Sequence, residues 1–161
     1  MRVGAAALIV ATGAALDLAT KAWARASLEA YGPVLDFLPF VSLHLTFNEG
    51  VSFSLLAFKS DMGQAALVVI TGLLTLIMAI WAYRSQGWHR AALSLVVAGA
   101  LANLIDRGAR GSVTDFLNLH FWDWHFFVFN LADVWISLGA VFLLALQIIP
   151  PKNPNKITSL P

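Results

Sequence analysis

Asparagine and aspartate recur close together in the second half of this chain, in segments that border long apolar stretches. The three segments are Asn103-Leu104-Ile105-Asp106-Arg107, Val113-Thr114-Asp115-Phe116 and Phe129-Asn130-Leu131-Ala132-Asp133. Asp115 and Asp133 are 18 positions apart, which leaves enough chain to turn back and bring them together. Two carboxylates in close contact cannot both ionise, so such a pair shares a proton and can activate water for attack on a carbonyl. The spacing therefore makes this pair a candidate hydrolytic site.

The sequence lacks the motifs of several other kinds of catalytic site. The sequence has no Gly-x-Ser-x-Gly, His-Glu-x-x-His, P-loop or glycine-rich dinucleotide turn. It has no cysteine, which excludes disulfides, thiolate nucleophiles and cysteine–zinc sites. We interpret His44 as a residue on the polar face of a strand, and His120 and His125 as interfacial residues, rather than as metal ligands. No metal and no cofactor is expected.

The composition indicates the kind of protein that must position this pair. Of 161 residues, 59% are apolar and 12% charged, whereas soluble domains have roughly 45–50% apolar and about 25% charged residues. The net charge of +1 offers no basic surface for nucleic acid. The chain is therefore predicted to be an integral membrane protein.

The chain has four charge-free stretches. The stretch at 62–83 by itself reaches the length of about 20 residues that crosses a bilayer, and the other three approach it once bordering polar residues are added. We predict one integral-membrane domain over residues 1–161, with transmembrane helices at 3–24, 62–83, 90–107 and 131–150 and a cytoplasmic tail at 152–161. The first stretch also has features of a secretory signal, but the membrane segments that follow favour a retained helix.

The four predicted spans divide the charges between the two sides of the membrane. All nine acids fall on one side, in residues 17–61 and 106–133. The short segments on the other side carry only basic residues, which is typical of cytoplasmic loops. We therefore expect both termini in the cytoplasm and the candidate site towards the outer face.

Two segments on the acidic side are not helical in pattern. Residues 40–47 alternate apolar and polar side chains, residues 48–50 are turn formers, and residues 51–55 alternate again. This pattern predicts an extracytoplasmic β-hairpin over residues 40–55, between the first two helices. Residues 106–133 are interpreted as an irregular segment whose aromatic cluster lies at the membrane interface.

Taken together, these residues resemble a known family, the lipoprotein signal peptidases (signal peptidase II), which are bacterial membrane aspartyl proteases. The match consists of four blocks in order along the chain. They are Asp17 to Lys21, Asn48 to Ser54, Gly99 to Arg107, and Val113 to Phe116 together with Phe129 to Asp133. The third block departs slightly from the family pattern, because it begins Ala98-Gly99 where Gly-Gly is common.

The resemblance implies a fold, a reaction and a set of roles. The fold would be all-α, with four transmembrane helices and a small β-cradle on the outer leaflet. The enzyme would be a monomeric aspartic endopeptidase of the bacterial inner membrane that cuts prolipoproteins before a diacylglyceryl-modified cysteine, in contact with membrane lipid. Asp115 and Asp133 would form the catalytic dyad. Supporting roles would fall to Asn48, Asn103, Arg107 and Asn130, and to Asp17, which would pair with Lys21.

Two other functions stay open on the residues alone. A small proton-coupled transporter also uses membrane aspartates, although usually near the middle of a span. In a non-catalytic membrane scaffold, Asn130 or Asp133 would simply cap the last helix. Capping is compatible with catalysis as well.

Overall fold

A computed structural model describes residues 1–50, 61–122 and 124–148 of the chain. It contains four helices and four strands. The elements are α1 (Val3–Ser27), β1 (Leu35–Leu38), β2 (Val41–Asn48), α2 (Asp61–Arg84), α3 (Gly87–Arg110), β3 (Val113–Phe121), β4 (Trp124–Phe129) and α4 (Leu131–Ile148).

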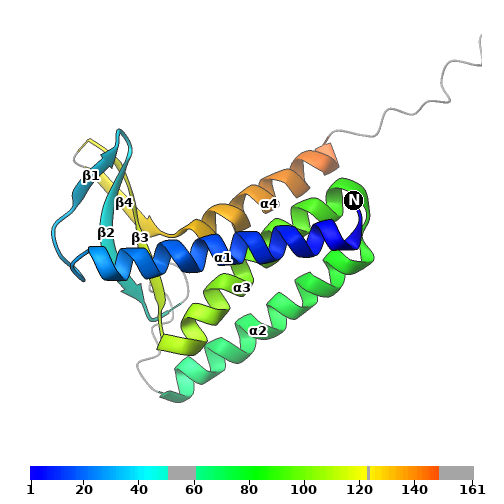
Figure 1. Ribbon diagram of the computed structural model, residues 1–161, viewed down its shortest axis with the longest axis horizontal. Coiled ribbons are helices and arrows are strands. Elements are labelled where there is room, and N and C mark those ends of the chain that lie inside the picture. The colour runs from blue at the N-terminus through cyan, green and yellow to red at the C-terminus, as the bar shows by residue number, and fades with distance from the viewer. Residues whose placement is uncertain (51–60, 123, 149–161) are drawn as a thin grey trace, which may run out of the picture.

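The helices form a bundle around α3, which packs against each of the other three (Figure 1). Each of the four is long and apolar enough to cross a membrane, as the charge-free stretches predicted. The outer faces of the helices carry exposed apolar side chains, most extensively on α2. Such faces suit contact with lipid rather than with water.

Glycines bring α3 and α4 into close contact. A Cβ atom at Gly99 would overlap the carbonyl oxygen of Ala132 and lie 2.8 Å from Ile136 Cγ1. At Gly139 it would lie 2.6 Å from the carbonyl oxygen of Ala92. Small residues that allow backbones to approach are typical of packed membrane helices.

A four-stranded antiparallel sheet lies at the end of the bundle where α1 ends and α4 begins (Figure 1). Its strand order is β1-β2-β3-β4, so the long strand β2 pairs with β3, about seventy positions further along the chain. Gly111 takes a left-handed conformation (φ 78°) that ends α3 and turns the chain directly into β3.

The sheet corrects the predicted cradle. Residues 41–48 do form a strand, but the strands paired with it are β1 and β3. The strand predicted at 51–55 lies outside the described residues. Residues 113–121 and 124–129, which fall in the segment interpreted as irregular, form two of the four strands, so the fold is not all-α apart from one hairpin. Phe116 of β3 is buried, whereas the aromatic cluster that follows it in the chain is exposed: Phe121, Trp122, Trp124, Phe126 and Phe127.

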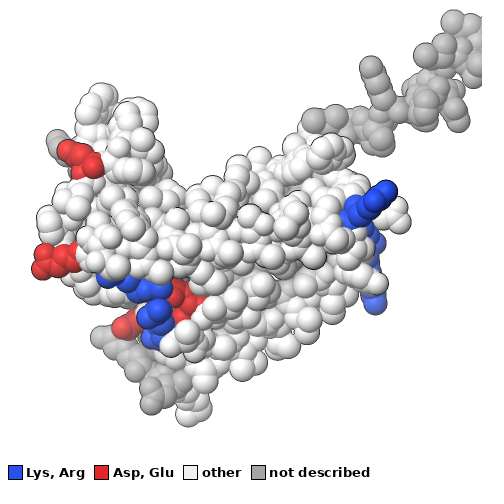
Figure 2. All heavy atoms as spheres, in the orientation of Figure 1, with Lys and Arg blue, Asp and Glu red and all other residues white. Residues whose placement is uncertain are grey.

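Charge separates along the long axis of the molecule. In the view of Figure 2, acidic side chains gather at the sheet end and only basic side chains are seen at the opposite end. This agrees with the division of charges expected from the sequence.

Candidate active site

A cavity of about 1130 Å³ opens where the sheet meets the helix bundle. Its walls come from α2, α3 and α4 and from strands β2, β3 and β4. Most of the wall is apolar, including Leu74, Met78 and Ile136. Five of the seven predicted site residues line it: Asn48, Asn103, Arg107, Asp115 and Asp133.

Asp115 projects from β3 and is 5% exposed. Its Oδ1 accepts a hydrogen bond of 2.6 Å from Nδ2 of Asn130. Burial raises the pKa of Asp115 to about 7, the charge of Asp133 adds to the rise, and hydrogen bonds from Asn130 and Asn48 oppose it. A carboxyl group with such a pKa can hold a proton at neutral pH and release it during a reaction.

Asp133 lies in the first turn of α4, where its carboxylate also caps the helix. Asn130 donates its backbone N–H to Oδ2 of Asp133 (3.1 Å), and Asp133 donates its own N–H to Oδ1 of Asn130 (3.1 Å). This reciprocal pattern is a capping box, with aspartate in the place usually taken by glutamate. The capping interpretation is thus correct for both residues, and it fixes the orientation of Asp133.

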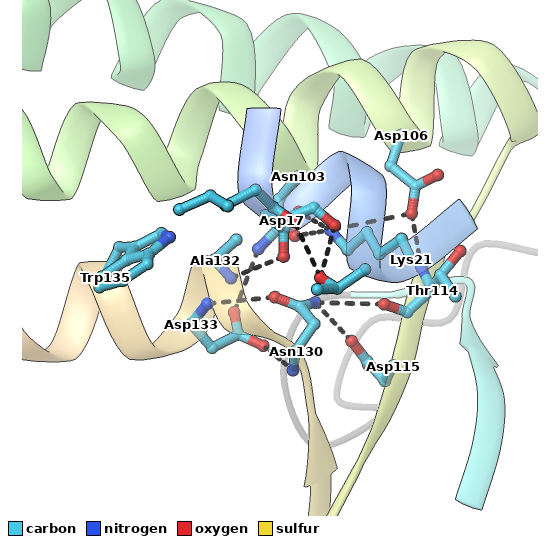
Figure 3. Close-up of polar contacts among 12 residues, drawn as sticks. Asp17, Lys21, Asn103, Asp106, Thr114, Asp115, Asn130, Ala132, Asp133 and Trp135 are labelled. Carbon is cyan, nitrogen blue, oxygen red and sulfur yellow. Dashed lines mark hydrogen bonds and ion pairs between the residues drawn. The ribbon is translucent and has the colours of Figure 1, made fainter. Parts of the chain in front are cut away.

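Asn130 joins the two aspartates. Its backbone and Oδ1 hold Asp133, while its Nδ2 donates to Asp115 and, at 3.3 Å, to the carbonyl oxygen of Thr114 (Figure 3). Asn130 is fully buried, so these contacts are protected from water. The two carboxyl groups are therefore held on one cavity wall by a single shared residue.

Asn103 holds the second oxygen of Asp133. Its Nδ2 donates to Oδ1 of Asp133 over 3.1 Å, and its own Oδ1 accepts a 2.6 Å hydrogen bond from Nζ of Lys21. Lys21 forms the ion pair with Asp17 that the i,i+4 spacing suggested, at 2.7 Å. The other oxygen of Asp17 accepts the backbone N–H of Ala132 in α4 (2.7 Å). Asp17 and Lys21 therefore lie behind the cavity wall rather than in it.

Arg107 holds the end of β2 at the mouth of the cavity. Its Nη2 donates to the carbonyl oxygens of Asn48 (3.3 Å) and Gly50 (2.6 Å). The Oδ1 of Asn48 accepts the N–H of Gly50 in a local turn. Because the register sets Asn48 opposite Val113 and Thr46 opposite Asp115, the side chain of Asn48 is brought beside Asp115.

Asp106 belongs to a different cluster. Its carboxylate pairs with Arg25 (3.2 Å) and with Arg110 (3.3 Å), and accepts the backbone N–H of Thr114 (2.8 Å). It is buried, but it is not among the described residues that line the cavity. Its contacts fix the start of β3, one residue before Asp115.

Two participants were not placed in the site by sequence reasoning. Thr114 is held by Arg25, Asp106 and Asn130, and so orients Asp115. Lys21 was noted only as a partner of Asp17, although it also contacts Asn103, 82 positions away. Its i,i+4 spacing from an aspartate at membrane depth was the one available signal.

The three described histidines of the sheet lie away from this cavity. Asn118 contacts Nδ1 of His125 (2.6 Å), the rings of His120 and His125 are 5.7 Å apart, and His44 lines a separate cavity of about 270 Å³. Within the described part of the chain, no group of three or more histidine and acidic side chains could hold a metal ion.

This arrangement has the parts of a hydrolytic site. One carboxyl group can carry a proton and a second accepts hydrogen bonds only from N–H donors. Both face a cavity with room for an extended peptide. Such a pair can remove a proton from water and supply one to a carbonyl oxygen.

Comparison with known proteins gives consistent results. A family model for signal peptidase (SPase) II matches residues 9–149. A lipoprotein signal peptidase of Yersinia pseudotuberculosis is 37% identical over 145 residues, which cover 88% of this chain and 85% of that protein. One of Yersinia pestis is 35% identical over 147 residues, with coverages of 89% and 86%.

Two solved structures share the fold. Both are bacterial membrane enzymes determined by the in meso method, at 2.3 and 1.9 Å resolution. Their TM-scores are 0.79 and 0.77, at 23% and 24% identity. The matches cover 93% and 92% of this chain and 94% and 95% of theirs.

Proposed function

The chain belongs to the signal peptidase II family, and from that premise we propose that it is an aspartic endopeptidase that removes signal peptides from diacylglyceryl-modified prolipoproteins. The cut precedes the lipid-modified cysteine. The observation that carries the proposal is the pair Asp115 and Asp133, joined by Asn130 and facing one cavity. The curated relatives, whose names are lipoprotein signal peptidase, support the choice of substrate.

In the proposed reaction the two aspartates have different roles. Asp115 carries the shared proton, since its pKa is raised to about 7. Asp133, which accepts hydrogen bonds from Asn103 and from the backbone of Asn130, is the charged partner. Its carboxylate takes a proton from water as that water attacks the scissile carbonyl, and Asp115 gives its proton to the carbonyl oxygen. As the resulting diol collapses, Asp115 takes back one hydroxyl proton and Asp133 gives its proton to the departing amine, so both aspartates return to their starting states and no covalent enzyme intermediate forms.

The remaining predicted residues have supporting roles in this proposal. Asn48 donates to Asp115 from the sheet, and Arg107 fixes the strand end from which Asn48 projects. Amide and guanidinium groups can hold peptide carbonyls without competing as bases. Asp17 is structural, because it holds the first turn of α4 through Ala132. All these residues come from one chain, so a monomer suffices.

Lipid recognition follows from the cavity wall. Apolar side chains of α2 and α4 continue from the aspartates along the helices, among them Leu74, Met78 and Ile136. Each buried acyl methylene contributes about 0.8 kcal/mol, so a diacylglyceryl group can supply much of the binding energy. We expect the unmodified precursor to be a poor substrate.

The aspartates lie at the sheet end of the bundle rather than at mid-helix, which favours the peptidase over a transporter. The direct test is incubation of the purified protein, in lipid, with a diacylglyceryl-modified prolipoprotein and with its unmodified precursor. Mass spectrometry should find cleavage before the lipid-bearing cysteine in the first only. Equal turnover of both would remove lipid recognition from the mechanism, and cleavage of neither would contradict the function.

We propose a topology with both termini in the cytoplasm of a bacterial cell and the site towards the outer face of the inner membrane. Reporter fusions after Arg84 and Lys152 should report the cytoplasm. A fusion after Gly111 should report the outside. The reverse pattern would put the site on the wrong side for an exported substrate.

A further inference from the structure

Lys21 is an unusual residue to find buried among membrane helices. It lies in α1, its side chain is fully buried, and it is surrounded by α1, α3 and the start of α4 (Figure 3). Desolvating an ammonium group is costly, and apolar side chains of similar volume can fill such a space at least as stably. What the ammonium group adds is hydrogen bonds in fixed directions.

The contacts of Lys21 determine which way the amide of Asn103 points. An ammonium group can only donate hydrogen bonds, so the amide atom that it contacts at 2.6 Å must be the oxygen. The amide nitrogen then faces Oδ1 of Asp133 and donates to it over 3.1 Å. With the amide reversed, its oxygen would face the carboxylate oxygen, and two acceptors would repel each other.

Lys21 is also tied to the turn that carries Asp133. Its ion-pair partner Asp17 accepts the backbone N–H of Ala132, the residue before Asp133. Lys21 therefore connects to Asp133 by two routes: through the amide of Asn103 to its carboxylate, and through Asp17 to its backbone.

From this geometry we propose that Lys21 is a positioning residue of the peptidase site, acting through Asn103 to hold the carboxylate of Asp133 in the orientation that activates water. The inference rests on the proposed function, and it adds to the site a residue that touches neither aspartate of the pair. Asn103 transmits the effect, because it is the only described side chain bonded to both Lys21 and Asp133.

The charge of Lys21 gives a second, independent readout. The charged groups near the aspartate pair are Lys21 and Asp17 from α1 and Arg107 from α3, and Asp106 of α3 lies beside Lys21 and Arg107. Strand β2 and the residue before α4 contribute the amides of Asn48 and Asn130. Lys21 is one of the groups that lower the pKa of Asp115. Without its charge, Asp115 would keep its proton to higher pH, so the alkaline limb of the rate profile should move to higher pH.

The test compares four proteins that share the change Asp17→Asn, in which Asp106, 3.8 Å from Nζ of Lys21, remains as a counter-ion for Lys21. Because Lys21→Met alone would leave Asp17 unpaired, the reference protein carries Asp17→Asn, whose amide oxygen can still accept the N–H of Ala132. To it are added Lys21→Met, Asn103→Leu, or both. Activity on the lipid-modified substrate is measured as kcat, KM and a pH profile, and folding as Tm.

Either single addition should lower kcat by about 10- to 100-fold with little change in KM, as expected for one hydrogen bond to a charged group. Both together should lower kcat no further, because residues that act as a unit are not additive. Lys21→Met should also move the alkaline limb to higher pH. Losses that multiply, or an unchanged kcat and pH profile in a folded Lys21→Met protein, would overturn the proposal.

A matched control distinguishes positioning from general stability. Arg110 forms the same i,i+4 pair with an aspartate as Lys21 does, but its side chain is half-exposed and contacts Asp106. Arg110→Gln should leave kcat and the pH profile unchanged.

A second variant keeps the proposal testable if Lys21→Met prevents folding. Asn103→Leu with Lys21 intact removes the contact that connects Lys21 to Asp133, and full kcat in that protein would contradict the proposal. Failure of the wild-type protein to cut any substrate would instead contradict the proposed function.

Discussion

Two groups of polar side chains lie side by side at the sheet end, and they are built in opposite ways. The ion cluster consists of Asp106 with Arg25 and Arg110, so one carboxylate is paired with two guanidinium groups, and Nζ of Lys21 lies 3.8 Å from its Oδ2. The cavity wall consists of Asp115, Asp133 and Asn130, where the described hydrogen-bond donors to the two carboxylates are amides. Compensated charge stabilises a fold, whereas under-compensated charge at a cavity can titrate and do chemistry.

The two groups also depend on each other. The ion cluster fixes Thr114, and Thr114 precedes Asp115. The comparison therefore predicts that damage to the cavity wall removes activity with the fold intact, whereas damage to the ion cluster weakens the fold and affects activity only through it.

The largest effect is expected for the aspartates of the cavity wall. Asp115→Asn or Asp133→Asn keeps shape and hydrogen-bonding capacity but removes a carboxyl group that must exchange protons. Each should lower kcat/KM by about 10³-fold or more, measured on the lipid-modified substrate, with expression and membrane insertion unchanged. Asp36→Asn, at an exposed position of β1, is the control and should be nearly silent. Full activity in either site variant would favour the scaffold alternative.

The ion cluster should respond in the opposite way. Asp106→Asn keeps an acceptor for the N–H of Thr114 but leaves Arg25 and Arg110 without their shared counter-ion. Loss of one partner from a buried pair costs about 3 kcal/mol, so Tm should fall clearly. Well below the new Tm, kcat should stay within about tenfold of wild type. A 10³-fold loss of kcat with an unchanged Tm would show that Asp106 takes part in the reaction, and would contradict the distinction between the two groups.

Overpacking the contact between α3 and α4 should have a smaller effect, and it should lower both stability and activity. Gly99→Ala forces a methyl group against the carbonyl oxygen of Ala132, next to Asp133. Overpacking of this kind costs about 1–3 kcal/mol, and the shift of α4 should lower kcat as well as Tm. Gly108→Ala, where a Cβ meets nothing within 4 Å, is the matched control. It should be neutral or slightly stabilising, and equal effects of the two changes would show that the contact at Gly99 is not limiting.

The smallest expected effect is a change in the free energy of unfolding with pH, caused by the titration of Asp115. Folding raises its pKa from 3.8 to about 7, so between these values the folded state binds more protons than the unfolded state. The free energy of unfolding should therefore fall by roughly 1 kcal/mol per pH unit as the pH rises from about 4 to about 7. Asp115→Asn removes this dependence. Its Tm should exceed that of wild type at pH 8 and match it near pH 4, and a parallel pH dependence in both proteins would contradict the raised pKa.

Much of this fold was predictable because its signals are local. Charge-free stretches identified the helices, and alternation identified the strand at 41–48. The partner of that strand was not predicted: Leu117, Leu119 and Phe121 alternate with Asn118 and His120, but alternation indicates a strand without indicating which strand it pairs with. Pairing across about seventy residues leaves no local signal either.

The candidate site was also predictable only in part. Asp115, Asp133 and Asn130 could be singled out because their residue types and spacing suggest chemistry. The relay from Lys21 to Asn103 could not, because it depends on how α1 packs against α3. The ion cluster was equally hidden. Asp106 adjoins Arg107 in sequence, but the helix directs it to Arg25 and Arg110.

The central claim is that Asp115 and Asp133 act as one unit, and the most direct test compares the two single asparagine variants with the double variant. All three proteins would be purified in lipid, checked for equal Tm at pH 5, and assayed for kcat/KM on the diacylglyceryl-modified substrate. The account predicts that the double variant loses hardly more activity than either single one, because one missing carboxyl group already disables the pair. Losses that multiply in the double variant would contradict it, and would mean that the two aspartates contribute separately.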